Sequence, residues 1–459
     1  MQIRSSLLAV SATFLVAATP QVDADVWKAG VAEIKITPEK PMWMMGYASR
    51  NKPATDKMTE LWTKAIALEG PNSTRAVLIT IEVSNTYRDL SNRVCEQLAD
   101  KYQLPRKSIA ICATHTHSGP VVGHRAYFLF DEEHHRRKVE YDKTLERKMV
   151  AVAGQAIENL SPCRLTWSVG KATFAVNRRN NRAAEVPKLR AAGKLRGPVD
   201  HDVPVLFVED DAGQVRAIVC GYACHATVLS SYEWSGDWPG FAQIEMEKCH
   251  PSATAIVWAG CGADQNPEPR RKVEFARQYG LEIAQAVDDA RAERTNVIEG
   301  RLACHYAEID LAWAHIPSRE ELESDSKSTN RYVAARAKQL LAVLDREGQI
   351  APAYPYPVQT WQLGDGPTMV FLGGEVVVDY SLRVKAELDA RSTWVAAYAN
   401  DGMAYIPSER VLGEGGYEGA SAMIYYGRPS PWATGIEKRI VDEVHRQVTL
   451  VRAEAMKDS

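Results

Sequence analysis

The strongest constraint on the fold is a series of short apolar runs, rich in β-branched residues, that alternates with segments of helical periodicity. Runs of this length and composition are typical of buried strands. They occupy residues 76–83, 108–113, 203–208, 217–223, 253–258, 369–372 and 394–398. Because helical segments separate several of the runs, the sequence predicts an α/β fold with a mixed β-sheet core flanked by helices.

Helices are predicted where apolar residues recur every three or four positions. Leu90, Val94 and Leu98, for example, recur every fourth residue and would share one helical face. A glycine such as Gly348 is a common stop at the end of a helix. The predicted helical segments are residues 87–102, 270–291, 318–348 and 432–451.

Composition narrows the class of protein. Of the 459 residues, 45% are hydrophobic and 25% charged, which is typical of a globular protein and not of a disordered, coiled-coil or multispanning membrane chain. The net charge of −3 gives no indication of a nucleic-acid partner. No repeat or long linker interrupts residues 25–459, so we predict one large catalytic domain. Its expected partner is a small-molecule, lipid or glycan substrate. The oligomeric state stays open.

The N-terminus has the pattern of a secretory signal peptide. Arg4 precedes an apolar stretch, and small residues stand at positions −1 and −3 of a cleavage site after Ala24. The stretch is short for a transmembrane helix, and no later stretch reaches the ~18 apolar residues that such a helix needs. A buried N-terminal helix is the alternative. We expect residues 1–24 to be removed and residues 25–459 to be secreted or periplasmic.

The eight cysteines are too sparse for a disulfide scaffold and include no CxxC pair. Most of them lie inside apolar runs, which favours burial as small hydrophobic residues. Disulfide pairing stays open.

Polar residues directly after the predicted strands are the candidates for chemistry, because α/β sheets bind ligands beyond the carboxyl ends of their strands. After the run at 108–113 the chain reads ATHTHSGP, in which His115 and His117 stand two apart. In extended backbone both side chains project to the same side. This spacing suits a metal ion or an acid/base pair, although two structural histidines would also explain it. The next residues do not continue the HxDH pattern of binuclear metallo-β-lactamase-type sites, which favours a single metal ion.

Two more candidates follow other strands. His225 comes after the run at 217–223, and alone it would be interpreted as a core histidine. Glu375 follows the run at 369–372 and lies in an apolar stretch, where an unpaired carboxylate would cost several kcal/mol of desolvation. Glu375 therefore needs a cation, which is either a neighbouring arginine such as Arg383 or a metal ion.

A Gly-rich stretch after the last predicted strand carries Tyr405 and Tyr417. Loops at strand ends often carry function, although both tyrosines could equally be packing residues. Two imidazoles and a carboxylate match the open zinc sites of hydrolases. Zinc is thus the predicted metal, with iron in a two-histidine, one-carboxylate triad as the alternative.

In their order along the chain, these motifs resemble the catalytic domain of the neutral (neutral/alkaline, non-lysosomal) ceramidase family. The similarity covers most of residues 27–425. It includes WKAGVAEIKITP from Trp27, MMGY, ATHTHSGP, NRR at 177–179, HATVLSSYEWSGDWPG from His225, and YEGAS from Tyr417. Several motifs in order argue against chance similarity.

The resemblance implies roles for individual residues. The implied zinc ligands are His115, His225, Glu375 and Tyr405. The residues implied around the reacting carbonyl are His117, Arg178 and Tyr417, and the implied backbone position in the pocket lining is Gly46. The spacing of twelve between Tyr405 and Tyr417 is that of the family's two loop tyrosines.

The sequence departs from the family where a Ser-Pro step is expected. Here the chain reads AGCGADQNPEP, with Asn266 before Pro267 and no serine nucleophile. Metal-activated water needs no serine, so hydrolysis can persist, but the departure weakens the case for ceramide as substrate. Asp264 could act as general acid or base, or cap the helix predicted from near Arg270. Family members that cleave ceramide usually carry a C-terminal immunoglobulin-like domain, which we expect to be absent.

The expected reaction is hydrolysis of an N-acyl (amide) bond in a ceramide-like or other N-acylated substrate. Arg178 and Tyr417 would stabilise negative charge on the substrate oxygen, and His117 would pass protons.

Two alternatives stay open. The first is a zinc-dependent glycoside hydrolase, in which carboxylates would serve as acid/base groups and tryptophans as sugar platforms. Its residues would be Asp264, Asp401 and Glu418, with Trp43, Trp234 and Trp238. The second is a noncatalytic zinc-stabilised binding protein, because zinc with four protein ligands is usually structural.

Overall fold

Three mixed β-sheets form the centre of the computed structural model, which describes residues 26–123 and 131–456. The first sheet has the order β5 (Ile109–Ala113), β4 (Arg75–Ile81), β3 (Trp62–Glu69), β1 (Lys28–Lys35) and β6 (Ser161–Pro162). The second has the order β12 (Thr254–Ala259), β10 (Val215–Tyr222), β9 (Asp202–Glu209), β7 (Arg164–Lys171) and β14 (Asn296–Val297). The third has the order β15 (Leu302–Ala312), β16 (Ala353–Leu363), β17 (Thr368–Leu372) and β19 (Thr393–Ala396).

Each of these sheets has one parallel pair of strands at an edge. The parallel pairs are β4 with β5, β10 with β12, and β17 with β19, and the remaining neighbours are antiparallel. Parallel neighbours end at the same edge of their sheet. The loops that follow these strands therefore emerge side by side.

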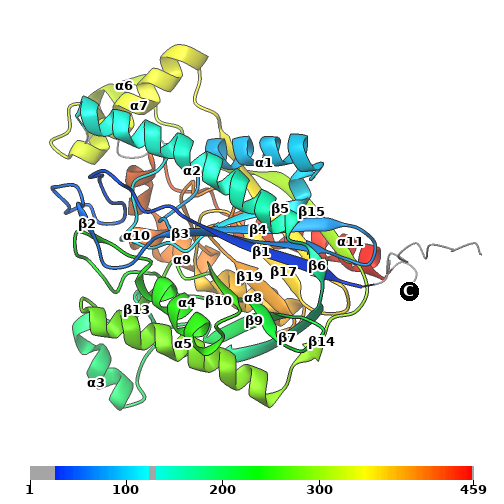
Figure 1. The fold of residues 1–459 in the computed structure, drawn as a ribbon. Coiled ribbons are helices and arrows are strands. Elements are labelled where there is room, and N and C mark those ends of the chain that lie inside the picture. The colour runs from blue at the N-terminus through cyan, green and yellow to red at the C-terminus, as the bar shows by residue number, and fades with distance from the viewer. Residues whose placement is uncertain (1–25, 124–130, 457–459) are drawn as a thin grey trace, which may run out of the picture.

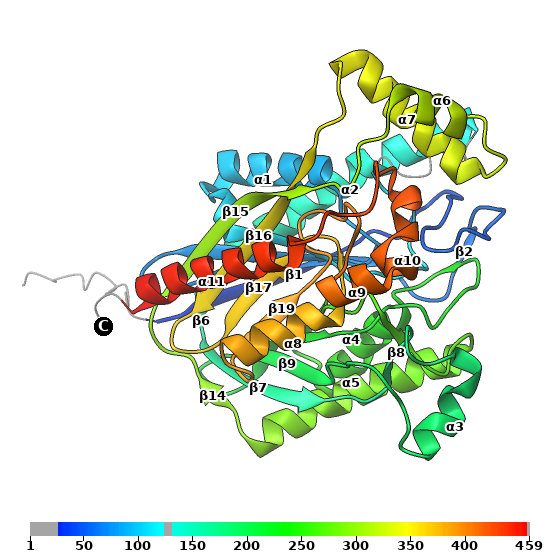
Figure 2. The same cartoon turned by 180° about the vertical axis from the view of Figure 1, so that it is seen from behind.

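Helices cover the outer face of each sheet (Figures 1 and 2). The first sheet is covered by α1 (Arg88–Tyr102) and α2 (Glu132–Glu158), and the second by α4 (Asp237–Cys249) and α5 (Val273–Glu293). The third packs against α8 (Val378–Glu387) and α11 (Ile436–Ala455), which lie in front in Figure 2. The remaining α-helices are α3 (Val186–Ala191), α6 (Arg319–Asp325), α7 (Arg331–Glu347), α9 (Glu409–Glu414) and α10 (Gly416–Gly419).

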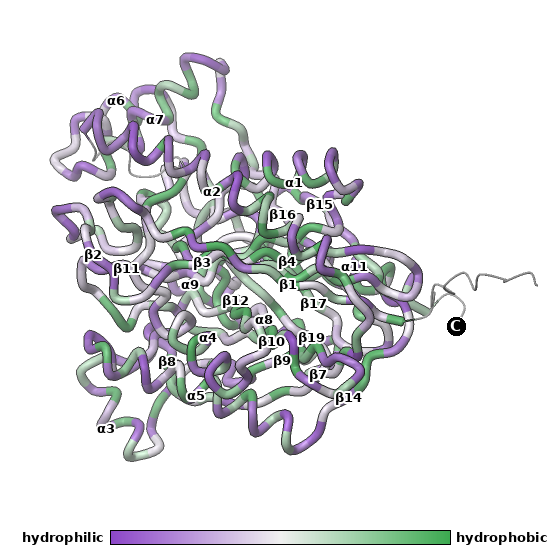
Figure 3. Tube along the Cα trace, viewed as in Figure 1, coloured by the Kyte–Doolittle hydropathy of each residue, from purple (hydrophilic) through white to green (hydrophobic). Residues whose placement is uncertain are grey.

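The inner faces of the three sheets share one hydrophobic core, visible as the hydrophobic central strands in Figure 3. This core includes Leu78 of the first sheet, Trp258 of the second and Phe371 of the third. Short two-stranded pairings extend beyond the sheets. They are β8 (Ala175–Asn177) with β13 (Gln265–Pro267), β18 (Glu375–Val376) with β20 (Tyr405–Ile406), and β2 (Asp56–Lys57) with β11 (Glu233–Trp234).

The predicted α/β class is confirmed, and each predicted apolar run contains a strand. The core differs from the prediction in being divided among three sheets. Strands such as β1 and β15 were not predicted, because charged residues interrupt their apolar pattern. The segment 318–348 contains two helices, α6 and α7, and α7 ends at Gly348 as predicted.

The predicted signal peptide, residues 1–24, lies outside the described residues. Within the described part of the chain, no helix combines the length and the apolar character needed to cross a bilayer. All eight cysteines are unpaired, and six of them are buried, as expected for small hydrophobic residues.

The contact between β10 and β12 predicts a sensitive core position. A Cβ atom on Gly221 would lie 2.3 Å from the buried ring of Trp258. We expect Gly221→Ala to lower the free energy of unfolding by about 1–3 kcal/mol, as overpacking does in other cores. Urea unfolding measures the change. The control is Gly413→Ala in α9, where a Cβ meets nothing within 4 Å. Equal stability of the two variants would contradict the prediction.

Candidate metal centre

The loops that carry the predicted histidines are joined by backbone pairing between two sheets. His115 and His117 follow β5 of the first sheet, and His225 follows β10 of the second. Thr116 forms a parallel bridge with Ala226, and the backbone N–H of His117 donates to the carbonyl of Ala226 at 3.1 Å. The three imidazoles are thereby brought to one place.

The carboxylate and the phenol come from the two-stranded pairing of β18 and β20, whose strands follow β17 and β19 of the third sheet in the chain. Glu375 in β18 and Tyr405 in β20 are direct partners in a parallel pairing. The backbone N–H of Glu375 donates to the carbonyl of Ala404 at 2.8 Å. Their side chains therefore lie next to each other at the ends of β17 and β19.

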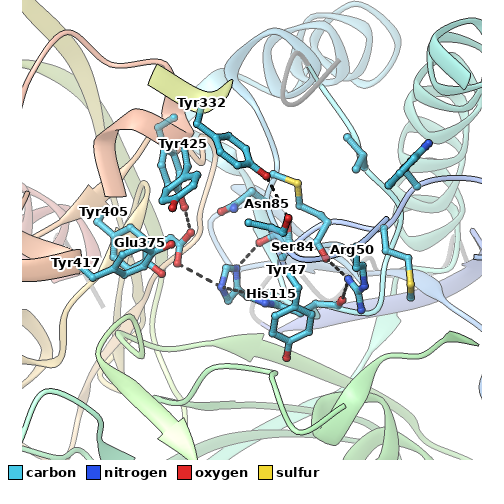
Figure 4. Close-up of a pocket in the computed structure, with 18 residues that line it drawn as sticks. Tyr47, Arg50, Ser84, Asn85, His115, Tyr332, Glu375, Tyr405, Tyr417 and Tyr425 are labelled. Carbon is cyan, nitrogen blue, oxygen red and sulfur yellow. Dashed lines mark hydrogen bonds and ion pairs between the residues drawn. The ribbon is translucent and has the colours of Figure 1, made fainter. Parts of the chain in front are cut away.

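All four predicted ligands converge, and Figure 4 shows three of them, His115, Glu375 and Tyr405. Glu375 Oε2 lies 3.3 Å from His115 Nε2 and 3.5 Å from His225 Nε2. The hydroxyl of Tyr405 lies 3.5 Å from His225 Nε2. His117 Nε2 is 3.1 Å from His115 Nε2, so a fifth predicted residue faces the same point.

Backbone carbonyls orient two of the imidazoles. His115 Nδ1 donates to the carbonyl of Ser84 at 2.5 Å, and His225 Nδ1 donates to the carbonyl of Gly262 at 2.7 Å. Because each Nδ1 carries the proton, each Nε2 offers a lone pair to the centre, as metal-ligating histidines do. Burial lowers the pKa of His115 to about 4 and also lowers the pKa of His225, so both rings are neutral at pH 7.

Glu375 supplies a buried negative charge to the same point. Burial by itself would raise the pKa of Glu375, but the attraction of His115 and the contact with His225 hold it at about 2. The hydroxyl of Tyr426 donates to Oε1, while Oε2 is buried and has no hydrogen-bond donor among the described residues. An ionised oxygen that faces imidazole lone pairs requires a cation, so these side chains fit a divalent metal ion.

The arginine alternative for Glu375 is wrong. Arg383 pairs instead with Glu387 and Glu437 on the outer side of α8. His115, His117 and His225 form a group that could hold a metal ion, with their ligand nitrogens within 4.8 Å of one another. This group includes His117, for which the sequence predicted proton transfer.

His115 is held in an uncommon conformation. Its φ of +60° lies in the left-handed region, which costs a non-glycine residue of the order of 1–3 kcal/mol. Its ring stacks on Tyr398 with 4.1 Å between ring centroids. Such strain is typical of functional sites and is compensated here by the stacking and by the hydrogen bond to Ser84.

A cavity of about 210 Å³ opens onto this centre. Its lining is mainly aromatic and includes Trp43, Tyr47, Tyr332, Tyr405, Tyr417, Tyr425 and Tyr426. Gly46 also lines it, as the resemblance implied. At Gly46 φ is +105°, and a Cβ would lie 2.3 Å from the ring of His117, so only glycine fits against this imidazole.

Arg178 and Tyr417 stand beside Tyr405. Arg178 Nη2 donates to the Tyr405 hydroxyl at 3.2 Å, and its Nε donates to Glu418 at 2.7 Å. The ring of Tyr417 lies 5.3 Å from that of Tyr405, and Tyr417 is 44% exposed at the mouth of the cavity. The structure therefore brings both residues to the centre, with Arg178 behind Tyr405.

Comparison with known proteins agrees with this arrangement. Residues 27–266 match the family described as "Neutral/alkaline non-lysosomal ceramidase, N-terminal", which is more than half of the chain. The chain belongs to this ceramidase family. Membership supports a hydrolase. The matched range includes His115, His117, Arg178 and His225.

Solved structures extend the similarity in fold beyond the matched residues. The neutral ceramidase from Pseudomonas aeruginosa is 18% identical, with a TM-score of 0.71, and the match covers 95% of this chain and 76% of that one. A structure titled "Ceramidase complexed with C2" is 17% identical, with the same TM-score and the same coverage of both chains. The predicted resemblance is confirmed.

Asp264 lies beside the centre but not in the lining of its cavity. One of its oxygens accepts from the backbone N–H of Val378 at 3.0 Å, and the other from the Asn177 amide at 2.9 Å. The prediction that it caps the helix from near Arg270 is wrong, since α5 begins at Val273 without a side-chain cap. Asp264 instead caps α8, three residues after Glu375.

The acid/base residues of the glycosidase alternative also lie outside the cavity lining. Asp401 pairs with Arg88 and accepts from the Tyr354 hydroxyl, and Glu418 pairs with Arg178. Two of the tryptophan platforms, Trp234 and Trp238, are buried, while Trp43 lines the cavity.

Two residues that line the cavity, Tyr426 and Arg50, were not predicted from the sequence. Tyr426 contacts Glu375 directly, and the only signal for it is its place in the loop after YEGAS. Arg50 lines the cavity and donates to the carbonyls of His117 at 2.6 Å and Met45 at 2.5 Å, which fixes the Gly46 turn against His117. No local pattern marks Arg50, because two of the carbonyls that it binds, those of His117 and Ser231, are distant in sequence.

The buried hydrogen bonds of Asp264 predict a structural role. Asp264→Ala leaves the Val378 N–H and one N–H of the Asn177 amide unpaired, so we expect the free energy of unfolding to fall by about 1–3 kcal/mol. Urea unfolding measures this loss, and the exposed Asp211→Ala is the control. If both variants were equally stable, Asp264 would not be needed for capping α8.

Proposed function

We propose that this chain is a zinc-dependent amidase that hydrolyses the N-acyl bond of a ceramide-like or other N-acylated substrate. The observation that carries the proposal is the buried oxygen Glu375 Oε2, which has no hydrogen-bond donor in residues 26–123 and 131–456 and faces the Nε2 lone pairs of His115 and His225. Such a donor set is typical of catalytic zinc sites.

The proposed zinc ligands are His115, His225, Glu375 and Tyr405. When bound, zinc supplies Lewis acidity that lowers the pKa of water and polarises the scissile carbonyl. Burial and the negative charge of Glu375 raise the pKa of Tyr405 well above its usual value, so this phenol keeps its proton unless a cation is near. The positive charge of Arg178, which donates to the same hydroxyl, favours the phenolate as a ligand.

The remaining residues have roles in positioning and proton transfer. Arg178 and Tyr417 are placed to stabilise negative charge on the substrate oxygen, since both lie beside Tyr405. Burial holds the pKa of His117 well below its usual value, so its neutral ring can accept a proton from the reacting water and return it to the leaving amine. The Gly46 turn supports this ring.

The cavity supports an N-acyl lipid as the substrate class. Its tyrosines, Trp43, Met44 and Met45 offer apolar surface to an acyl chain. The structurally similar proteins are titled as ceramidases. Asn266 stands where the family has serine, and its amide oxygen faces Arg178 Nη1 at 3.5 Å. This arrangement suits catalysis by activated water. The proposed substrate class is defined by its N-acyl group and not by a particular amine.

The two alternatives have less support. A glycosidase lacks free carboxylates at this cavity, because those of Asp264, Asp401 and Glu418 are engaged elsewhere. A purely structural zinc site would not explain an open aromatic cavity that reaches the ligands. We also propose that the chain is exported, which N-terminal sequencing of the mature protein tests.

The proposal predicts that metal and activity are lost together. His225→Ala should reduce both the zinc content, measured by elemental analysis, and the hydrolysis of N-acylated lipids, because a ligand is removed. Hydrolysis should also stop with chelator, and nitrophenyl glycosides should not be cleaved. His315→Ala is the matched control, since this exposed histidine pairs only with Glu321. Full zinc content and activity in His225→Ala would refute the proposal.

A second prediction concerns Arg178 alone. Arg178→Lys keeps the positive charge but removes the planar guanidinium group, which donates from Nη2 to Tyr405 and from Nε to Glu418. The value of kcat should therefore fall by roughly 10²–10³-fold, while the zinc content is unchanged. Arg179→Lys is the control, because Arg179 pairs with Glu414 and Glu418 and does not contact Tyr405. If both variants showed the same kcat, Arg178 would have no role in charge stabilisation.

A further inference from the structure

A second, larger cavity lies on the other side of Arg178 from the metal centre. Its volume is about 620 Å³. It is formed by the loops around β8, α3 and β13, in the lower right of Figure 2. Its polar lining consists mainly of Arg178, Arg179, Arg182, Arg196, Arg270, Asn180, Asn181, Asn266, Glu185 and Glu268. Arginine and asparagine donors thus outnumber the carboxylates.

The positive charge of this cavity is only partly neutralised by the protein. Arg178 and Arg179 share Glu418, and Arg270 pairs with Glu268 at 3.0 Å. Arg182 and Arg196 line the same cavity and form no ion pair with any residue in the described ranges. Both side chains are exposed, and the Glu185 carboxylate in the same lining also forms no ion pair with a described residue, so two guanidinium groups and one carboxylate are open to solvent or to a ligand here.

The backbone of Arg196 is held by the buried side chain of Asn181, while the guanidinium group of Arg196 is exposed. The amide of Asn181 donates to the carbonyl of Arg196 at 2.6 Å, and the Asn181 oxygen accepts from the Arg196 N–H at 3.0 Å. Asn181 is 5% exposed and also donates to the carbonyl of Asn177 at 2.8 Å, next to Arg178. The hydrogen bonds of Asn181 thus join the segment that carries Arg178 to the segment that carries Arg196, and both arginines line the cavity.

We propose that this cavity binds a tetrahedral oxyanion, phosphate or sulfate, either free or as a monoester. Guanidinium groups present paired N–H donors that match the oxygens of such anions, and several arginines around one space bind them more tightly than exposed lysines do. The asparagine amides add uncharged donors. The partly unbalanced positive charge distinguishes this site from the aromatic cavity at the metal centre.

The oxyanion site is coupled to the metal centre through Arg178. This guanidinium lines the second cavity while its Nη2 donates to Tyr405. A bound oxyanion competes with Glu418 for Arg178 and so acts on the residue that contacts Tyr405. Binding itself does not depend on the proposed hydrolysis, so the two proposals can fail separately.

Titration calorimetry of the full-length protein with inorganic phosphate tests the site, at ionic strength held constant with sodium chloride. Saturable binding is expected. The double variant Arg182→Gln/Arg196→Gln should raise the Kd at least tenfold, and Arg182→Lys/Arg196→Lys should restore part of the affinity. The control is Arg439→Gln, an exposed arginine on α11 outside the cavity, for which no change is expected.

Parallel titrations with sulfate and with glycerol phosphate distinguish the possible sources of the anion. Binding of inorganic phosphate alone identifies a free ion, and binding of glycerol phosphate as well identifies an ester group. Absence of saturable binding to phosphate and sulfate overturns the proposal. An unchanged Kd in the double glutamine variant overturns it too, because phosphate would then bind elsewhere, for example at the metal centre.

Discussion

The buried charge of Glu375 is the constraint on which the rest of the site depends. An ionised carboxylate in an apolar interior is costly unless a cation or several donors compensate it. Tyr426 satisfies one oxygen, and the other faces neutral imidazoles whose lone pairs are directed by Ser84 and Gly262. The hydrogen bonds to Ser84 and Gly262 leave the Nε2 atom of each imidazole as an acceptor that faces the centre. The side chains at this site could thus hold a metal ion.

This site exists because three sheets meet at their parallel edges. Isolated backbone bridges join each pair of sheets near the centre: Thr116 with Ala226, Cys112 with Ala399, and Gly260 with Ala396. Because each bridge fixes the start of a loop, the ligands from three separate sheets are positioned by backbone as well as by packing. The strain at His115 is tolerated for the same reason, since the backbone on both sides is held.

The sequence was sufficient for the strand-end residues and insufficient for their partners. His115, His225 and Glu375 follow continuous apolar runs, so the general rule for α/β sheets located them. The division into three sheets could not be predicted, because strands such as β15 alternate in polarity and their pairing is long-range. Tyr426 and the capping of α8 by Asp264 are tertiary contacts without a local pattern.

Arg178 shows how a residue behind the metal centre can control it. The guanidinium is fixed by Glu418 and in turn donates to Tyr405, so the charge beside this phenol is set by groups outside the aromatic cavity. Asn266 belongs to the same group, since its amide oxygen faces Arg178 Nη1 at 3.5 Å. An amide cannot act as a nucleophile, but it can orient the arginine. Asn266 is therefore part of the surroundings of Arg178, while His115, His225 and Glu375 contact one another directly.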